Sequence, residues 1–551
     1  MAKIRVQNLT FKYPLSSKMA LTDINLDVEK SSFVVICGKS GCGKSTLLRH
    51  MKKQMIPYGE KKGKVLIDNV EIEETDDRKS VSQIGFIQQN PELQLVTDKV
   101  WHELAFGLEN LGLNNQIIKR RVAEMANYFG IQAWFRKDVT QLSGGQKQLL
   151  NLASVMVMQP DILILDEPTS QLDPIATSEF LNTLHKINKE LGTTIIISEH
   201  RLEEVIPMAD KIVVMDQGKI IADQRPENVA TILYDKDKEK RHPMFEGFPA
   251  VMRIFQGING IEKTPLTVRD GRLLLEEILK NKEVKNNLFY REKKHIKKDK
   301  GKSIITLKDV WFKYNKGEDF VLRGAEIDIP KGSWFCMLGG NGVGKSTLLK
   351  AIAGNIKPQR GKITIKEDKS IAMVPQNPQA LFTEITVEEE LYEGICHLPF
   401  DEKYKLEQVE IMLKLMEIEH LREANPYDLS GGEQQRLAIG KVLLTKPDIL
   451  LLDEPTKGLD PFFKGTLADI FNKLNSNGLT IFMVSHDIEF CAEHGKICGM
   501  FFDGEIISVD EAKEFFAGNS FYTTSTNKLF RSYEPDIVTC KEAEEWMKKV
   551  I

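Results

Sequence analysis

Residues 38–46 read Gly-Lys-Ser-Gly-Cys-Gly-Lys-Ser-Thr, and residues 339–347 read Gly-Gly-Asn-Gly-Val-Gly-Lys-Ser-Thr. Each stretch follows an apolar run of strand type, Phe33–Cys37 or Trp334–Leu338, and precedes a helical pattern. A glycine-rich turn between a strand and a helix lets backbone N–H groups surround phosphates at the N-terminus of the helix. Each stretch therefore predicts an α/β domain with a phosphate-binding loop.

The two loops belong to a repeat that spans most of the chain. Leu-Ser-Gly-Gly occurs at 142–145 and again at 429–432, and an apolar run ends in Asp-Glu at 166–167 and again at 453–454. Matched positions are 301 residues apart up to the loops and 287 or 286 apart beyond them. A repeat of this length means two homologous domains, which we call the first and second repeat. Alternating strand and helix patterns predict a largely parallel sheet in each.

The chain divides into four expected segments. Residues 1–230 and 304–517 are expected to form the two nucleotide-binding domains. Residues 231–303 are expected to form a small helical extension followed by a charged linker, and 518–551 a C-terminal tail. The cluster at 291–302 carries seven Lys or Arg against two acids, which fits either a soluble tether or contact with anionic lipid headgroups.

The composition narrows the class of protein. The 551 residues are 42% hydrophobic and 28% charged, with a mean hydropathy of −0.27 and a net charge of −4. No nucleic-acid partner is expected, because such binding requires a strongly basic domain or face. No apolar run approaches the roughly 20 residues needed to cross a bilayer. The N-terminus lacks the apolar core of a secretory signal, so a membrane role would come from docking onto a partner.

The seven cysteines form no CxxC pair, which argues against disulfides and a zinc site and fits a reducing cytosol. Cys42 lies inside the phosphate-binding loop at a helix N-terminus, where the pKa of a thiol tends to fall. We therefore predict that alkylation of Cys42 blocks nucleotide binding.

Four pairs of matched residues carry the expected chemistry. Loop lysines reach the β and γ phosphate oxygens, and the serines beside them, with the aspartates that end apolar strands, hold Mg²⁺. The glutamates after those aspartates can polarise an attacking water. The pairs are Lys44 and Lys345, Ser45 and Ser346, Asp166 and Asp453, and Glu167 and Glu454.

Histidines and tyrosines at matched positions have two interpretations each. His200 and His486 follow short strands, where a histidine serves either as a structural cap or as a contact to the γ-phosphate and the attacking water. Tyr13 and Tyr314 lie in Phe-Lys-Tyr contexts and either pack in the core or stack on adenine. The neighbouring phenylalanines, residues 11 and 312, are the alternative core members.

Phosphate loop, LSGG signature, apolar-Asp-Glu, the loop aspartates Asp173 and Asp460 and the matched histidines together resemble the ATP-binding-cassette (ABC) ATPases. The resemblance implies a P-loop NTPase fold twice over, each copy with a parallel core, an antiparallel β part and a helical signature subdomain. It also implies that the two cassettes pair head to tail within the chain, so that each ATP is held by the phosphate loop of one cassette and the signature of the other.

The resemblance assigns two sets of site residues. Catalysis would fall to Glu167, His200 and Gln89, and to Glu454, His486 and Gln376. Mg²⁺ would be held by Ser45, Gln89 and Asp166, and by Ser346, Gln376 and Asp453. ATP would be bound by Tyr13, Gly38, Gly41, Gly43, Lys44, Ser45 and Thr46 with Ser430, Gly431 and Gly432, and by Tyr314, Gly339, Gly342, Gly344, Lys345, Ser346 and Thr347 with Ser143, Gly144 and Gly145.

Both sets are complete, which predicts two hydrolysing sites, although three departures leave room for inequality. Glu433 replaces the usual Gln of the signature, and Leu149 stands where the second copy has Arg436. The first histidine lies in Ser-Glu-His-Arg, whereas the second lies in Ser-His-Asp.

The segments after the two glutamines distinguish between kinds of ABC protein. Gln-Asn-Pro occurs at 89–91 and at 376–378, and the first copy continues into the helical run 100–113. These segments, with the extension at 248–253 and 264–268, look like the ATPase subunits of energy-coupling factor (ECF) transporters, which import vitamins and transition metals. The resemblance implies a peripheral protein on the cytoplasmic face of the cell membrane, bound to a transmembrane coupling subunit and working with a separate substrate-capture membrane protein. A ribosome-associated ABC-F protein and a fused sugar-importer ATPase are the alternatives, and the cargo is left open.

Overall fold

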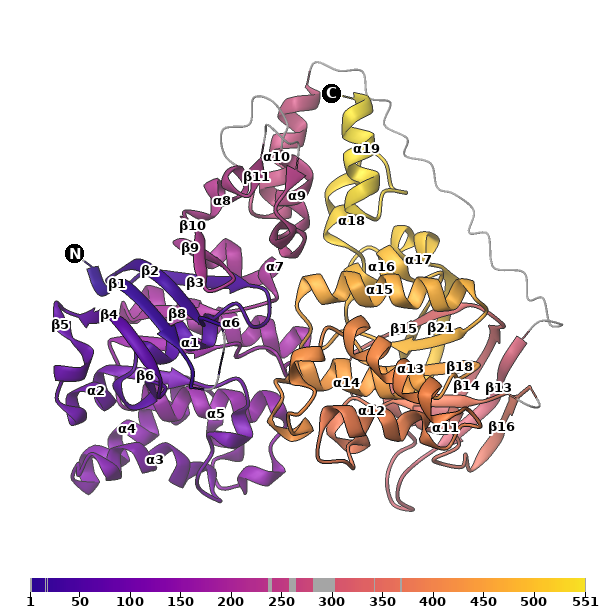
Figure 1. The fold of residues 1–551 in the computed structure, drawn as a ribbon, viewed down its shortest axis with the longest axis horizontal. Coiled ribbons are helices and arrows are strands. Elements are labelled where there is room, and N and C mark those ends of the chain that lie inside the picture. The colour runs from indigo at the N-terminus through magenta and orange to yellow at the C-terminus, as the bar shows by residue number, and fades with distance from the viewer. Residues whose placement is uncertain are drawn as a thin grey trace. The chain divides into compact units, whose positions relative to one another are not determined.

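The computed structural model describes residues 2–14, 16, 18–235, 240–256, 264–280, 303–340, 342–366 and 369–550. Its contacts separate the chain into two compact units, Met1–Thr267 with Asp460–Phe462, and Val268–Leu459 with Phe463–Ile551 (Figure 1). The basic cluster at 291–302 lies outside the described residues. These units are defined by contacts and not by the repeat, so they do not test the segment boundaries expected at 230, 303 and 517. Those boundaries stay predictions.

A six-stranded sheet forms the centre of the first repeat. Its strands lie in the order β10-β9-β3-β8-β7-β6, and all neighbours are parallel except β9 and β10. The strands are β3 (Phe33–Gly38), β6 (Ile84–Ile87), β7 (Ile162–Asp166), β8 (Thr194–Ser198), β9 (Lys211–Asp216) and β10 (Lys219–Gln224). Strands β3, β6, β7 and β8 are buried along their whole length, as expected for β-branched strands covered on both faces. The prediction of a largely parallel core is confirmed.

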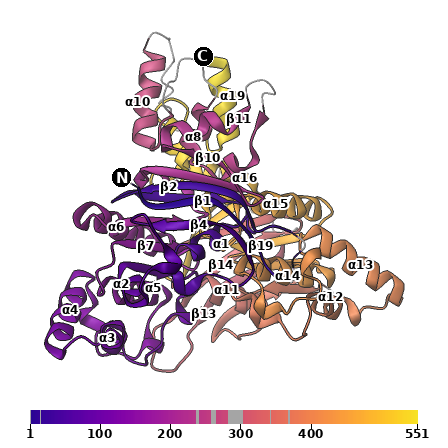
Figure 2. The ribbon, with the colours of Figure 1, turned by 60° about the vertical axis from the view of Figure 1, so that its left-hand side comes forward.

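The antiparallel part of the first repeat is a second sheet of order β2-β1-β4-β5. Its strands are β1 (Ala2–Lys12), β2 (Leu21–Glu29), β4 (Glu60–Ile67) and β5 (Val70–Glu71). Strand β1 pairs with both β2 and β4, and the three lie side by side in Figure 2. Phe11 of β1 and Leu47, in the helix after the phosphate-binding loop, belong to one apolar core that also contains residues of the central sheet.

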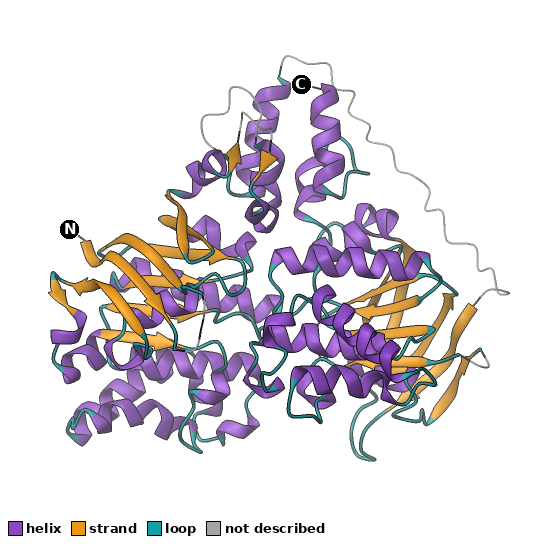
Figure 3. Cartoon of the chain, in the orientation of Figure 1, coloured by secondary structure: helices purple, strands orange, loops and turns teal. Residues whose placement is uncertain are grey.

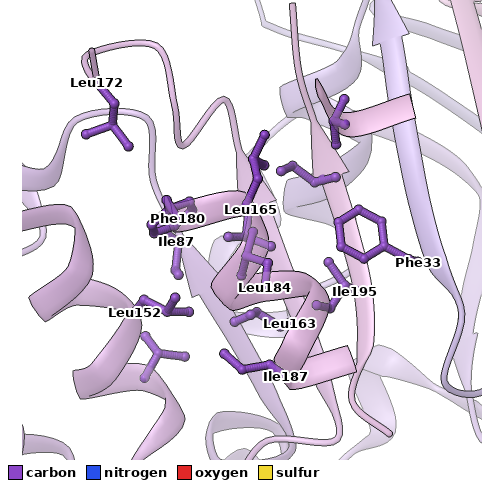
Figure 4. Close-up of a cluster of buried hydrophobic side chains, with 14 of the residues drawn as sticks. Phe33, Ile87, Leu152, Leu163, Leu165, Leu172, Phe180, Leu184, Ile187 and Ile195 are labelled. Atoms are coloured by element: carbon purple, nitrogen blue, oxygen red, sulfur yellow. The ribbon is translucent and has the colours of Figure 1, made fainter. Parts of the chain in front are cut away.

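Helices cover the sheets of each repeat (Figure 3). In the first repeat they are α1 (Lys44–His50), α2 (Asp77–Gln83), α3 (Val100–Asn110), α4 (Asn115–Tyr128), α5 (Gly144–Met156), α6 (Pro174–Leu191), α7 (Leu202–Val205) and α8 (Pro226–Ile232), and α9 (Ala250–Phe255) follows in the extension. Helices α3, α4 and α5 form the signature subdomain. Figure 4 shows Leu152 of α5 and Leu184 and Ile187 of α6 gathered around Leu163 of β7, where each is fully buried. This core fixes the ends of the strands that carry the expected site residues.

The second repeat has the same plan. Its six-stranded sheet has the order β17-β18-β19-β15-β20-β21 and its antiparallel sheet the order β14-β13-β16. The strands are β13 (Ser303–Phe312), β14 (Leu322–Pro330), β15 (Trp334–Leu338), β16 (Arg360–Ile365), β17 (Ile371–Val374), β18 (Ile449–Asp453), β19 (Thr480–Val484), β20 (Ile497–Phe502) and β21 (Glu505–Glu511). The helices are α11 (Lys345–Ile352), α12 (Val387–Cys396), α13 (Glu402–Leu415), α14 (Gly431–Leu444), α15 (Pro461–Ser476) and α16 (Ile488–His494). The fold class expected from the duplication is confirmed.

The remaining described segments are mostly helical. A short hairpin of β11 (Tyr234–Asp235) and β12 (Lys240–Arg241) precedes α9, and α10 (Val268–Leu279) lies beside α18 (Ser525–Phe530), where Arg272 Nε donates to the Lys528 carbonyl at 3.0 Å. Helices α17 (Ala512–Gly518) and α19 (Cys540–Val550) complete the tail. None of the helices in the described ranges has both the length and the apolar character that a membrane span requires.

Candidate functional site

The phosphate-binding loops sit between strand and helix as the sequence predicts. Gly43 and Gly344 precede α1 and α11 with φ of 103° and 111°, a region that favours glycine. A Cβ on Gly43 would lie 2.5 Å from the Ala20 carbonyl oxygen, so a side chain does not fit there. The ammonium of Lys44 donates to the Gly38 carbonyl at 2.9 Å, folding back over the loop. The turn therefore leaves the first amides of the helix available to an anion.

The loop serine and the strand-end aspartate are joined in both repeats. Ser45 Oγ donates to Asp166 Oδ1 at 3.0 Å, and Ser346 Oγ donates to Asp453 Oδ1 at 3.0 Å. Burial, then the charge of the adjacent glutamate, raises the pKa of Asp166, and burial is also the main reason that the pKa of Asp453 is raised. Each repeat thus places a partly buried serine hydroxyl and a buried carboxylate next to the loop lysine.

The glutamates that follow the aspartates are held in an uncommon backbone conformation. Glu167 and Glu454 have φ of 46° and 54°, which a residue with a side chain adopts only where its surroundings impose it. His200 Nε2 lies 2.8 Å from Glu167 Oε1, and His486 Nε2 lies 3.0 Å from Glu454 Oε1. The structure therefore brings together the glutamate and histidine that the sequence pairs in each repeat.

The first glutamate has two further partners. Lys44 Nζ lies 3.7 Å from Glu167 Oε1, and the Gln89 side-chain amide donates to Glu167 Oε2 at 2.9 Å. Burial raises the pKa of Glu167, but the charge and hydrogen bond of His200 and the charge of Lys44 outweigh it and bring the pKa to about 2. In the second repeat Gln376 is exposed and is not hydrogen-bonded to Glu454, both residues being within the described ranges.

The aromatic pairs resolve into a core ring and a surface ring. Phe11 is fully buried and Phe312 is 7% exposed, so the phenylalanines are the core members. Tyr13 and Tyr314 pack edge-on against them, and their hydroxyls lie 3.1 Å from Thr46 Oγ1 and Thr347 Oγ1. Tyr314 is 52% exposed. Each tyrosine thus lies beside its phosphate-binding loop, and the one in the second repeat is largely exposed. Stacking on adenine stays a prediction.

The signature serines begin their helices as caps. Ser143 Oγ accepts the Gln146 N–H at 3.3 Å in front of α5, and Ser430 Oγ accepts the Glu433 N–H at 3.4 Å in front of α14. In both helices the third residue reaches back to the serine N–H, at 3.0 Å from Gln146 and 2.9 Å from Glu433. Glutamate and glutamine complete the same capping box, so the departure at Glu433 leaves the helix start unchanged.

The departure at Leu149 and Arg436 is matched by a second substitution. The Arg436 guanidinium lies 3.9 Å from the centre of the Phe463 ring and 3.5 Å from a Glu417 oxygen. In the first repeat Ala176 stands at the position of Phe463, and Leu149 and Ala176 both pack on the apolar core of that repeat. A cation–π pair in one repeat is thus replaced by aliphatic packing in the other.

The interpretation of Cys42 is wrong. Its side chain is only 4% exposed, in the same apolar core as Met215 under the antiparallel sheet, and burial raises the pKa of its thiol despite the nearby lysine. The helix N-terminus does not activate a thiol that water cannot solvate. Alkylation of Cys42 is therefore not an expected route to inhibition of the folded protein.

Sequence reasoning missed three buried acids. Glu103 and Glu390 each accept two backbone N–H groups from the segment that follows Gln-Asn-Pro. They are 287 residues apart, so the repeat register itself would have found them. Glu199, 2% exposed, accepts the Thr169 N–H at 3.1 Å and has no counterpart acid in the second repeat. The sequence signal for Glu199 is the stretch Ser-Glu-His, where the second repeat has Ser-His.

Comparison with protein-family models identifies the family. The model of the ABC transporter family matches residues 21–170 and 322–457, just over half of the chain. The chain belongs to the ABC transporter family. It is a two-cassette ABC ATPase, and its cassettes bind ATP.

Relatives span the whole protein. One relative is a Bacillus anthracis protein that carries the name ABC transporter ATP-binding protein. It is 43% identical over 556 residues, which cover 99% of this chain and 98% of its own. A similarly named Methanosarcina mazei protein is 33% identical over 538 residues, covering 94% of this chain and 90% of its own. The arrangement of two fused cassettes is therefore shared along the full length.

The solved structure of an archaeal protein has the same fold as this chain. An archaeal ribosome recycling factor, aABCE1, in complex with the ribosomal stalk protein aP1, has a TM-score of 0.59 at 21% identity and covers 93% of this chain and 91% of its own. CbiO1 of Clostridium perfringens, described as part of the ABC transporter complex cbiONQ, is 34% identical over 42% of this chain and 91% of its own, with a TM-score of 0.39.

Proposed function

We propose that this ABC ATPase is the motor of a membrane import complex of the energy-coupling factor type, moving a vitamin, a vitamin precursor or a transition-metal ion. The observation that carries the proposal is the pair of Gln-Asn-Pro segments. Asn90 caps the turn Pro91–Leu93, and Asn377 caps the turn Pro378–Leu381, by accepting N–H groups at 3.0 and 3.1 Å. The same polar turn in both cassettes supports a common role, and contact with a transmembrane coupling subunit is that role.

Exposed apolar side chains lie at the end of the first turn and beyond it. Leu93, Val96 and Trp101 are 76%, 67% and 44% exposed, and we call them the first docking patch. Buried Glu103 holds the backbone of this segment through the N–H groups of Val96 and Thr97, at 3.1 and 2.8 Å. Apolar side chains presented on a fixed backbone suit a partner helix, because their burial stabilises the complex without ordering a loose loop.

The second cassette presents a comparable segment. Ile385 is 73% exposed, and Glu390 fixes the loop before it by accepting the N–H groups of Thr383 and Glu384 at 2.9 and 2.7 Å. Two docking segments on one chain suit a partner with two cytoplasmic contact helices. The substrate-capture protein would then be a separate membrane subunit, and this chain would be peripheral on the cytoplasmic face of the membrane.

The residues fit Mg²⁺-ATP as the substrate of both cassettes. Ser45 and Asp166, with Gln89, offer the neutral and anionic oxygens that this cation prefers, and burial with the adjacent Glu167 charge raises the pKa of Asp166, so a bound cation would favour its ionised form. Ser346, Asp453 and Gln376 repeat the set in the second cassette. Bound Mg²⁺ would neutralise the charge on the phosphate oxygens.

The chain's own side chains would then position the attacking water. Glu167 and Glu454 accept its proton, while His200 and His486 orient the glutamates and contact the γ-phosphate. We propose that the signature residues Ser143 and Ser430, with the glycines after each, close on the ATP of the opposite cassette. Hydrolysis would release that closure and so move the coupling subunit.

The test is to follow the Glu167→Gln/Glu454→Gln protein with ATP in cell extracts. We expect it to sediment with membranes, and Leu93→Asp/Val96→Asp added to it to return the protein to the supernatant. Tyr58→Asp is the matched control, since Tyr58 is 90% exposed and lies outside the docking segments. Sedimentation with ribosomes in place of membranes would overturn the proposal in favour of a ribosome-associated ATPase.

A further inference from the structure

The two catalytic glutamates are anchored differently, although each has a glutamine and a histidine at matched positions. In the second cassette the backbone N–H of His486 donates to Glu454 Oε2 at 3.1 Å. In the first cassette the backbone N–H of His200 donates instead to Glu199 Oε2 at 3.2 Å. The main-chain group that binds one catalytic glutamate is therefore bound by another acid in the other cassette.

Glu199 occupies the place of a serine. The N–H of Glu199 donates to the Ile36 carbonyl and the N–H of Ser485 to the Met337 carbonyl, both at 3.2 Å, and Ile36 and Met337 are matched residues of β3 and β15. Glu199 is 2% exposed and Ser485 is fully buried. A buried carboxylate is costly unless its oxygens are hydrogen-bonded.

Both oxygens of Glu199 are bound by the main chain around the catalytic residues. Oε1 accepts the N–H of Thr169, two residues after Glu167, and Oε2 accepts the N–H of His200. Burial, with the Glu167 charge adding to it, raises the pKa of Glu199. The carboxylate thus ties the loop after the catalytic glutamate to the backbone of His200.

Because the His200 N–H binds Glu199, one oxygen of Glu167 is left for a different donor. With the His200 N–H bound elsewhere, Glu167 Oε2 accepts the Gln89 amide at 2.9 Å, whereas Gln376 in the second cassette is exposed and, as part of the described chain, makes no hydrogen bond to Glu454. We infer that Glu199 is a positioning residue that links the base of the first cassette to Gln89, and through it to the Gln-Asn-Pro docking segment. Hydrolysis in the first cassette is therefore the step that responds to the partner; this rests on the proposed roles of Glu167 and the docking segments.

The inference is tested by a double-mutant cycle in the otherwise wild-type chain. We compare kcat for ATP in Gln89→Ala, Glu199→Ser and the double variant, with Gln376→Ala as the reference for losing the same amide where no link exists. Gln89→Ala should lower kcat about tenfold more than Gln376→Ala does, within the range found for coupled neighbours. In the Glu199→Ser background this excess should disappear, while the Kd for ATP stays unchanged.

Two results would overturn the inference. One is an effect of Gln89→Ala that is the same in the wild-type chain and in the Glu199→Ser background, which would make Glu199 a loop brace independent of Gln89. The other is equal losses for Gln89→Ala and Gln376→Ala in the wild-type chain. If Glu199→Ser does not fold, Glu199→Gln carries the cycle, because an amide oxygen accepts one N–H but its NH₂ accepts none. Sedimentation of the Glu167→Gln/Glu454→Gln protein with ribosomes would instead refute the proposed function, so the two failures are distinct.

Discussion

A buried ion pair in the second cassette offers a test of how the segment after Gln376 is held. The Lys441 ammonium on α14 is paired with Glu390 and, at 2.8 Å, with Glu393, and it donates to the Leu381 carbonyl at 2.7 Å. Glu390 is fully buried and Lys441 is 8% exposed. The substitution Lys441→Met fills a similar volume and leaves the Glu390 carboxylate in the interior without its cation.

The magnitude follows from what remains around the carboxylate. Removing one partner of a buried ion pair costs about 3–5 kcal/mol. Glu390 keeps its hydrogen bonds from the Thr383 and Glu384 amides, which offset part of this cost. Glu103 shows that two such amides can suffice, since it is 5% exposed and has no ion-pair partner within the described ranges. We therefore expect a loss at the lower end, about 3 kcal/mol.

Differential scanning calorimetry gives the measurement. For a unit of this size a loss of about 3 kcal/mol lowers the melting temperature by roughly 6–12 °C. The double variant Glu390→Gln/Lys441→Met removes both charges and should recover most of the loss, because an uncharged pair carries no desolvated ion. A shift of less than about 2 °C for Lys441→Met, or a double variant no more stable than the single one, would refute this reasoning.

Three further predictions concern the cassettes themselves. Glu167→Gln and Glu454→Gln should each lower ATP turnover by at least about 100-fold per affected site, measured by phosphate release; a silent variant would show that one site does not hydrolyse. The pKa of Glu167 falls from 4.5 to about 2 on folding, so its contribution to stability is fully present above pH 4.5 and is lost as the pH falls towards 2. In denaturant unfolding, the free energy of unfolding that the protein loses over this pH interval should be smaller in Glu167→Gln by on the order of 3 kcal/mol. Gly43→Ala should destabilise the first cassette by well over the roughly 1–2 kcal/mol expected for Gly41→Ala, since both have positive φ but only Gly43 has a carbonyl 2.5 Å from the added Cβ; equal melting temperatures would contradict this.

Much of the fold could be predicted because the decisive signals are local. The strand Trp334–Leu338 and the strand Thr194–Ser198 are found as expected, since short β-branched or aromatic runs between turn signals leave few alternatives. The pairing of Asp166 with Ser45 also followed, because strand ends and the phosphate-binding loop meet at one edge of a parallel sheet.

What could not be predicted depends on packing between distant segments. Cys42 obeys the local rule for a helix N-terminus in sequence, but its burial in the core that contains Met215 sets the pKa of its thiol. Glu199 is a single-residue difference between the two histidine motifs, and its role depends on which backbone N–H groups donate to its carboxylate. A sequence pattern names the residues of a site without fixing which donor each acceptor receives.

The residue after each matched histidine is also bonded differently in the two cassettes. Arg201 donates to the Leu172 carbonyl and to Thr177 Oγ1, both at 3.2 Å. In the second cassette an ion pair takes its place, since Lys464, at the position of Thr177, donates to Asp487, at the position of Arg201, at 2.5 Å. Both arrangements join the histidine strand to the helix that follows the loop aspartate, so this connection is retained while its chemistry changes. Around Glu199 the side chain itself differs, since Ser485 stands at its position in the second cassette, and the acceptor of the histidine N–H differs with it. Equality of the two sites therefore has to be argued from their hydrogen bonds, and these place the distinction at Gln89.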